Sequence, residues 1–297
     1  MSLLLSILGV YFFVSLGFAA KRIFGEIHER TLVLLSVYFL QPILSFWGIL
    51  GAKIDFAAAT APLIYFGISL FAAVFGFLVF SRIFQDKKDA VIVTAGGVIG
   101  NTGNLGIPLL LAMFGKTAVF YAVLINLANI FVLYVIGVFL YSLGSYTAKE
   151  ALKNILSMPV IWSASVALAM NYFGISLPSA FDQTIEMGAY TSMTLQLIIF
   201  GVFLGGLGRF KPDFKLVAWG MGYKFAAVPL LAFAVLSLLD IDSFIKSLIF
   251  LQVCMPLAVN NVNLASLYDC KPYTVTANIL ASSLLFAGLI FVYKSVF

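Results

Sequence analysis

The chain has 297 residues, of which 63% are hydrophobic and only 10% are charged, and its mean hydropathy is +1.10. A soluble domain carries about 25% charged residues, so this composition excludes an ordinary soluble protein and indicates one embedded in lipid. The net charge of +5 comes from Lys and Arg residues spread between apolar runs, which favours a role in membrane topology over nucleic-acid binding. One His and two Cys leave little for metal or thiol chemistry.

The first apolar segment, Leu3 to Ala20, begins directly after Met1 and Ser2 and is followed by Lys21 and Arg22. A cleavable signal peptide has its positive charge before the apolar core, which is the reverse of this order. We therefore expect a transmembrane helix here rather than a signal peptide.

Ten segments are apolar over about the 20 residues that a membrane crossing requires. They cover residues 3–20, 31–50, 58–80, 90–114, 117–142, 158–177, 185–206, 216–238, 244–268 and 273–295. The connections are short, the longest running from Leu143 to Ser157, so no extramembrane domain is expected. The pattern predicts an all-α polytopic membrane protein with ten transmembrane helices.

Lys and Arg residues are distributed unequally between the two sides of these segments. Twelve lie in the connections after odd-numbered segments, and only four lie on the opposite side. Because cytoplasmic loops carry the excess of Lys and Arg, we expect both termini outside, in the cytoplasmic (inner) membrane of the cell.

The fourth segment is interrupted at its centre by the run Gly100-Asn101-Thr102-Gly103-Asn104-Leu105-Gly106-Ile107-Pro108. Gly costs about 1 kcal/mol and Pro about 3 kcal/mol in a helix interior, so this run cannot form a regular helix. Unpaired backbone groups cost several kcal/mol in hydrocarbon, so the unwound chain must be buried or line a cavity.

The ninth segment carries a comparable run, Met255-Pro256-Leu257-Ala258-Val259-Asn260-Asn261-Val262-Asn263. Asn side chains donate and accept hydrogen bonds, so they can pair with freed backbone groups or with a substrate. Each break would also leave a helix N-terminus in the cavity, starting near Pro108 in one segment and near Asn261 or Asn263 in the other. Such ends carry partial positive charge and suit a carboxylate. The alternative is a pair of Pro-kinked structural helices.

The two breaks coincide when the first half of the chain is shifted so that Asn101 falls on Pro256. The same shift places Gln41 on Gln196. Each half would hold five segments, and an odd number forces opposite orientations, so the pattern predicts two inverted five-helix repeats. The alternative is that any chain with ten segments divides in this way.

The charged residues bear on coupling and on the substrate. All twelve Asp and Glu residues lie in connections or at segment ends, which disfavours carboxylate-based proton coupling. Lys224 lies in the eighth segment, about 12 Å from the nearer boundary. It could pair with a substrate carboxylate or donate to the carbonyl groups freed at the breaks, and we favour the second role.

Other polar residues in the segments are weaker signals. Asn126 and Asn129 in the fifth segment, and Gln41 and Ser45 in the second, can line the site or simply bond neighbouring helices. The candidate substrate-binding residues are Gln41, Ser45, Asn101, Thr102, Gly103, Asn104, Pro108, Asn126, Lys224, Pro256, Asn260, Asn261 and Asn263.

Both interrupted runs resemble the signatures of the auxin efflux carrier family. Supporting matches are Tyr268, Pro272, the run Phe39 to Pro42 and the run Lys224 to Pro229, so the resemblance covers essentially the whole chain. It implies a fold like that of bile-acid sodium symporters, in which broken helices 4 and 9 cross. It also implies a scaffold of residues 1–57 and 143–207, which forms a homodimer, and a transport domain of residues 58–142 and 208–297, which moves as an elevator.

The family resemblance implies a secondary transporter for a mono- or dicarboxylate such as malate, malonate or an auxin-like aromatic acid. Export of an anion is downhill by about 2.3 kcal/mol per charge per 100 mV, so we expect export without a cofactor. A sodium-coupled symporter of the bile-acid type is the alternative, because Na⁺ could bind neutral oxygens such as that of Thr102. A channel would be distinguished by its conductance. An intramembrane aspartyl protease is disfavoured, because Tyr268-Asp269 lacks a partner Gly-x-Gly-Asp motif.

Overall fold

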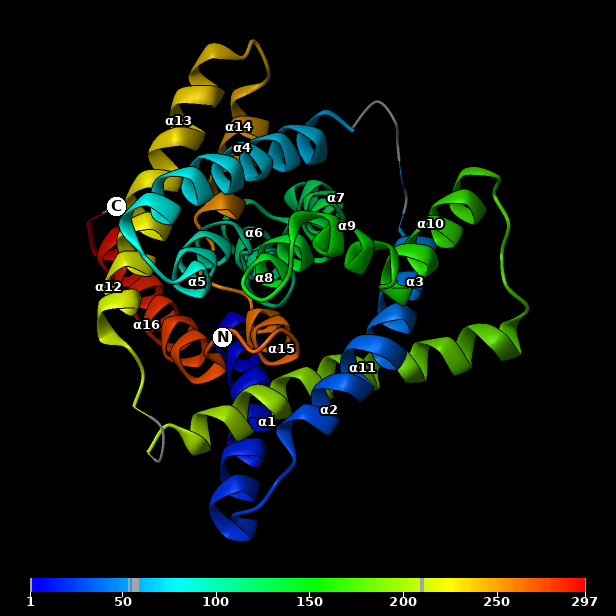
Figure 1. Cartoon of the computed structure of the whole chain (residues 1–297). Coiled ribbons are helices and arrows are strands. Elements are labelled where there is room, and N and C mark those ends of the chain that lie inside the picture. Colours follow the sequence, from blue (N-terminus) through cyan, green and yellow to red (C-terminus); the bar gives the residue numbers. More distant parts are fainter. Residues whose placement is uncertain (1, 53, 55–58, 209–210, 297) are drawn as a thin grey trace.

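The computed structural model describes residues 2–52, 54, 59–208 and 211–296, with side chains from residue 11 to residue 290 of these ranges (Figure 1). The named elements in the described residues are all helical. The α-helices are α1 (Ser2–Phe24), α2 (Glu29–Leu35), α3 (Gln41–Leu50), α4 (Thr60–Ile83), α5 (Lys87–Val98), α6 (Ile107–Phe114), α7 (Lys116–Phe131), α8 (Val138–Leu143), α9 (Ala148–Leu156), α10 (Pro159–Tyr172), α11 (Ser179–Gly206), α12 (Phe214–Gly222), α13 (Val228–Leu238), α14 (Ser243–Val253), α15 (Asn260–Leu267) and α16 (Pro272–Val296).

Six helical stretches in the described residues are long and apolar enough to cross a membrane, and a seventh is added if α9 and α10, which are bent by 49°, form one span. The six are Glu29–Leu50, Thr60–Ile83, Lys116–Leu143, Ser179–Gly206, Phe214–Leu238 and Pro272–Ile290. These findings confirm an all-helical, multi-pass membrane protein. The number is below ten because the predicted segments 90–114 and 244–268 are interrupted and the segment 158–177 forms only the short α10. The predicted segment 3–20 forms α1, whose first side chains lie outside the described residues.

In the part of the chain that the structure describes, four π-helical turns interrupt the long helices, at Ser36–Leu40, Thr102–Gly106, Val132–Gly137 and Tyr223–Ala227. Three of them are followed directly by an α-helix with Pro in its first turn, namely Pro42, Pro108 and Pro229. Pro lacks an N–H donor and its ring collides with the carbonyl group four residues earlier, so a wider turn accommodates it. The sequence therefore places these irregular turns through its prolines.

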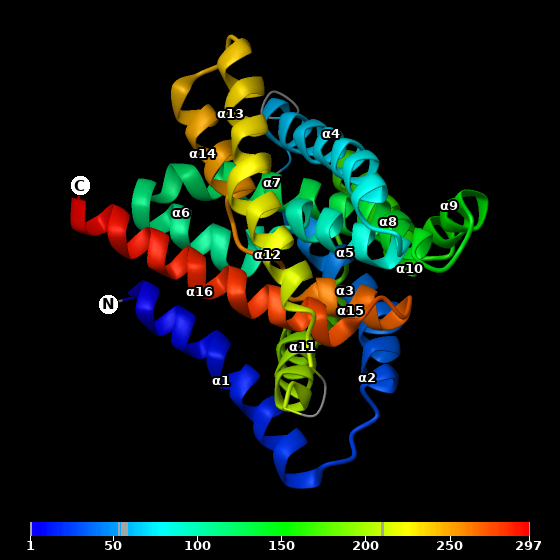
Figure 2. The ribbon, with the colours of Figure 1, turned by 60° about the vertical axis from the view of Figure 1, so that its left-hand side comes forward.

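The helices form two groups. Helices α1, α2, α3, α10 and α11 pack with one another, and most of the remaining helices pack with one another on the other side (Figures 1 and 2). In the first group α1 and α11 cross at very short range. A Cβ atom added to Gly17 would lie 2.0 Å from the carbonyl oxygen of Ile198, and one added to Gly201 would lie 2.0 Å from that of Val14. Both positions therefore require glycine for this backbone approach.

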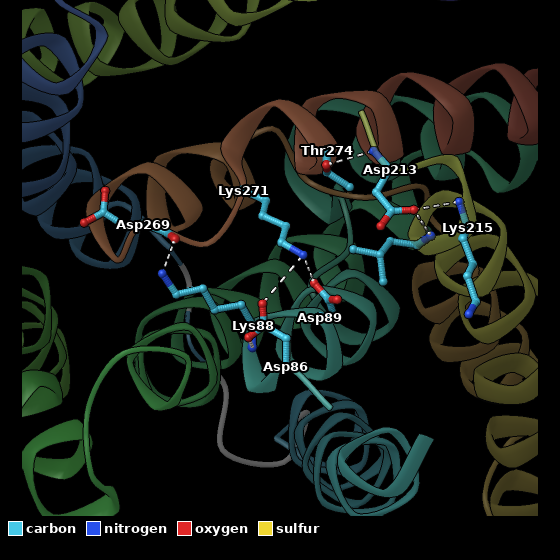
Figure 3. Close-up of polar contacts among 9 residues, drawn as sticks. Asp86, Lys88, Asp89, Asp213, Lys215, Asp269, Lys271 and Thr274 are labelled. Atoms are coloured by element: carbon cyan, nitrogen blue, oxygen red, sulfur yellow. Dashed lines mark hydrogen bonds and ion pairs between the residues drawn. The ribbon is translucent and has the colours of Figure 1, made fainter. Parts of the chain in front are cut away.

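In the second group the starts of α5, α12 and α16 meet in a polar cluster (Figure 3). Lys271, just before α16, pairs with Asp89 in the first turn of α5 and lies 3.7 Å from Asp86. Asp213, just before α12, donates its backbone N–H to the hydroxyl of Thr274 at 3.2 Å. These contacts tie three helix starts together at one end of the molecule.

The electrostatics of this cluster favour the charged form of Lys271. Burial by itself would lower the pKa of Lys271, but the hydrogen bond to Asp89 and the negative charges of Asp89 and Asp86 outweigh it, so the pKa is raised. The backbone here is also constrained, because Asp269 and Lys271 have positive φ angles of 53° and 43°. Lys88 stabilises that turn by donating to the carbonyl oxygen of Asp269 at 2.9 Å.

Candidate functional site

The two interrupted runs lie against each other and pair through their backbones. The N–H of Asn101 donates to the carbonyl oxygen of Pro256 at 2.7 Å, and the N–H of Ala258 donates to that of Ile99 at 3.0 Å. Gly100 and Leu257 form an antiparallel bridge between these bonds. The unwound segments thus satisfy each other's polar groups, which explains how both breaks persist inside an apolar protein.

Two asparagine side chains complete the pairing of the freed backbone. Asn261 donates to the carbonyl oxygens of Ile99 at 3.2 Å and Ala258 at 2.9 Å, and it accepts from the Tyr141 hydroxyl at 3.1 Å. Asn129 donates to the carbonyl oxygen of Gly100 at 2.9 Å. These amides are committed to holding the crossing together.

Lys224 lies beside the crossing in the π-helical turn Tyr223–Ala227, and its side chain is only 1% exposed. Its ammonium group donates to the carbonyl oxygens of Gly97 and Val253, each at 3.1 Å. Gly97 is in the last turn of α5 and Val253 is the last residue of α14. The C-terminal end of a helix carries partial negative charge, so Lys224 is placed to neutralise two such ends at once.

A cavity of about 410 Å³ lies between the crossing and helices α3, α7 and α11. Its lining residues are Gln41, Leu44, Ser45, Trp47, Gly48, Gly100, Asn101, Thr102, Gly103, Asn104, Ile107, Val123, Asn126, Leu127, Asn129, Ile130, Leu133, Tyr134, Met193, Gln196, Ala258, Val259 and Asn260.

Eight of the predicted site residues line this cavity: Gln41, Ser45, Asn101, Thr102, Gly103, Asn104, Asn126 and Asn260. Five do not: Pro108, Pro256, Asn261, Asn263 and Lys224. Asn263 instead donates to the Asn260 side chain at 3.1 Å. The further lining residues include Asn129 and Gln196, which the sequence shows as polar residues inside apolar segments, and Tyr134 and Met193, which no sequence pattern distinguishes from packing residues.

The polar part of the lining is neutral. Among the described residues that line the cavity none is charged, and seven carry amide side chains: Gln41, Asn101, Asn104, Asn126, Asn129, Gln196 and Asn260. Two helix starts also face the cavity, at Thr102 and at Asn260. Amide N–H groups and helix N-termini are donors to anions, so this lining can bind a carboxylate without an opposing charged side chain.

The packing of the fourth segment against α7 depends on a glycine. Thr102 donates its hydroxyl to the Asn126 side-chain oxygen at 2.8 Å. A Cβ atom added to Gly103 would lie 2.8 Å from that same oxygen. Gly103 therefore gives Asn126 the room to reach the crossing, and the hydrogen bond uses only the carbonyl group of the Asn126 amide.

A second cavity, of about 580 Å³, adjoins the first and shares Trp47, Gly48 and Val123 with it. It lies at the ends of α3 and α10 and at the start of α11. Asn171 crosses this region and donates to the carbonyl oxygens of Ile49, Leu50 and Ala52 at distances of 2.8 to 3.2 Å. The two cavities therefore meet at α3 and α7.

Comparison with known proteins agrees with these features. A family model described as membrane transport protein matches residues 2–293. The chain is also 25% identical to a protein of Methanocaldococcus jannaschii described as an uncharacterized transporter, over 296 residues that cover 93% of each chain. These findings confirm the resemblance carried by the two interrupted runs: the chain belongs to the membrane transport protein family, which is the family of the auxin efflux carriers.

Proposed function

We propose that this chain is a secondary transporter that carries a small organic anion, a mono- or dicarboxylate, and binds it where the two broken segments cross. One observation supports this most directly. The cavity at the crossing is lined by seven amides and two helix starts, and none of its described lining residues is charged. Such a site stabilises a carboxylate by hydrogen bonds and helix ends alone.

The proposal includes two inverted five-helix repeats. Asn101 and Pro256, which the repeat makes equivalent, face each other through a 2.7 Å hydrogen bond. Gln41 and Gln196, also equivalent and 155 residues apart, are joined by a second hydrogen bond of 3.3 Å. Two repeats related by a two-fold axis bring equivalent residues together where the axis passes between them. The two pairs therefore support a single two-fold axis that passes through the crossing and between α3 and α11.

The proposal also assigns different roles to the two helix groups. Residues 1–57 and 143–207 form a scaffold and dimer interface, and residues 58–142 and 208–297 carry the substrate by an elevator motion with both termini outside. The separation of α1, α2, α3, α10 and α11 from most of the remaining helices supports this division. Export follows from the membrane potential, which favours outward movement of an anion.

The experiment is a flux assay on purified protein in liposomes. Labelled carboxylates of different size are offered with a membrane potential of either sign, with and without a sodium gradient. Saturable flux that follows the potential and ignores sodium is the expected result. Flux that requires sodium would instead identify a symporter of the bile-acid type, and currents far above transporter turnover would identify a channel.

A further inference from the structure

The wall of the cavity opposite the crossing carries a polar stripe on α3 and α11. Gln41 donates to the Gln196 side-chain oxygen at 3.3 Å, and the rings of Trp47 and Tyr190 lie 5.6 Å apart. Between these two contacts the residue number rises by six on α3, from Gln41 to Trp47, and falls by six on α11, from Gln196 to Tyr190. The two helices therefore run antiparallel. One turn from the glutamine pair, this alignment places Ser45 at the level of Ser192 on the facing helix.

The stripe has hydrogen-bonding capacity that the described residues do not use. The hydroxyl groups of Ser45 and Ser192 are buried and have no partner among the described residues. Ser45 is 3% exposed and lines the cavity together with Gln41 and Gln196. The glutamine pair uses one N–H of Gln41 and the carbonyl group of Gln196, which leaves the Gln41 carbonyl group and the Gln196 NH₂ group for a ligand.

A buried polar group without a partner is costly, so this wall favours a ligand that can pair with it. A site built to hydrogen-bond a substrate rejects the analogue that lacks the bonding group far more strongly than an apolar pocket rejects a change of size. In the proposed function the carboxylate is bound at the opposite wall, where the helix starts at Thr102 and Asn260 face the cavity. A second polar group on the same acid can therefore reach the stripe.

We infer that Gln196, together with Gln41 and Ser45, is a specificity-determining residue that selects acids with a second hydrogen-bonding group, such as a hydroxyl or a second carboxylate, over unsubstituted apolar acids. This inference rests on the proposed function, because it takes the carboxylate to be bound at the crossing. It adds the assignment of Gln196 and the chemical class of the substrate.

The test compares matched acids on wild-type protein and variants, by ligand-induced thermal stabilisation of the purified protein. Two pairs serve as probes: butanoate with 3-hydroxybutanoate, and pentanoate with succinate. The wild type is expected to prefer the more polar member of at least one pair by about tenfold or more, as one buried hydrogen bond predicts. Gln196→Leu is expected to reduce that preference to less than about threefold, by weakening only the polar acid.

Gln252→Leu is the matched control. Gln252 is also a buried glutamine, but both polar atoms of its amide lack partners in the described residues and it does not line the cavity. Its substitution should leave the preference unchanged.

The outcomes separate the two proposals. If no acid of either pair stabilises the wild type, the binding site at the crossing is wrong. If acids bind but the polar members bind no better, or if Gln196→Leu weakens both members of a pair equally, carboxylate binding stands and the role of Gln196 is purely structural.

Discussion

At the scale of single residues, the asparagines of the site divide into two kinds. Asn129 accepts from the Tyr65 hydroxyl at 2.9 Å and donates to the carbonyl oxygen of Gly100, so both ends of its amide hold protein groups. Asn126, one turn earlier on α7, uses only its carbonyl group, toward Thr102. The sequence shows both as polar residues in one apolar segment. The sequence cannot show which of the two has a free amide group, because Tyr65, which donates to Asn129, comes from another helix, α4.

This difference predicts different effects for two alanine substitutions. Asn126→Ala should weaken carboxylate binding about tenfold, the effect of about one lost hydrogen bond, and it leaves one buried protein group, the Thr102 hydroxyl, without its acceptor. Asn129→Ala leaves a buried carbonyl group and a buried hydroxyl unpaired, so it should lower the melting temperature of the ligand-free protein further than Asn126→Ala does. Melting curves with and without a bound acid measure both effects. Equal melting temperatures for the two variants would contradict the division.

Lys224 is a second case in which the sequence left two roles open. The structure places its ammonium group on the carbonyl oxygens of Gly97 and Val253, away from the cavity lining. Lys224→Met should therefore lower the stability of the ligand-free protein by about 2 kcal/mol or more and abolish flux, because two buried acceptors lose their donor.

The control for Lys224→Met is Lys153→Met, which removes an exposed lysine and should change neither property. A Lys224→Met protein that melts like the wild type but no longer binds the acid would identify Lys224 as a substrate ligand. Wild-type flux in that variant would exclude both roles.

At the scale of helices, glycine and proline made the two breaks predictable, because their cost inside a helix is known and large. The partner of each break could not be predicted in the same way. The bonds from Asn101 to Pro256 and from Ala258 to Ile99 join segments far apart in the chain, and only the tertiary arrangement brings them together. The π-helical turn at Val132–Gly137 could not be predicted either, because no proline follows it as one follows the other three turns.

The crossing of α1 and α11 gives a prediction at this scale. Gly201→Ala places a methyl group 2.0 Å from the carbonyl oxygen of Val14, so the helices must separate, and overpacking of this kind costs about 1–3 kcal/mol. The melting temperature of the purified protein should fall by several degrees. Gly67→Ala, at a glycine with no atom within 4 Å of the added Cβ, is the control and should not destabilise the protein. Equal melting of the two variants would refute the close approach.

At the scale of the whole molecule, the elevator proposal requires the two helix groups to move past each other. Tyr273 at the start of α16 bridges them: its hydroxyl donates to Glu29 at 3.2 Å and its ring packs 5.5 Å from that of Phe203. A Cβ atom added to Gly206 would lie 2.6 Å from the Tyr273 ring. This contact joins the proposed scaffold to the proposed transport domain, so it must open during each cycle.

Cross-linking tests that requirement. In protein lacking Cys254 and Cys270, Gly206→Cys and Tyr273→Cys joined by a short cleavable linker should stop flux, and cleavage should restore it. Lys21→Cys with Gly205→Cys is the matched pair within the first helix group, where the Cβ atoms would be 2.8 Å apart, and its cross-link should leave flux intact. Full flux through the linked 206–273 pair would refute relative movement of the two groups.

The central proposal is that a carboxylate is transported through the crossing of the two broken segments. The most direct measurement is exchange of a labelled acid across the membrane of liposomes that contain wild-type protein or the Asn126→Ala variant. The acid is the one that most stabilises the wild type. We predict saturable exchange by the wild type and about tenfold weaker apparent affinity in the variant, which remains folded at the temperature of the assay. No exchange of any carboxylate by folded wild-type protein, or identical affinity in the variant, would contradict it.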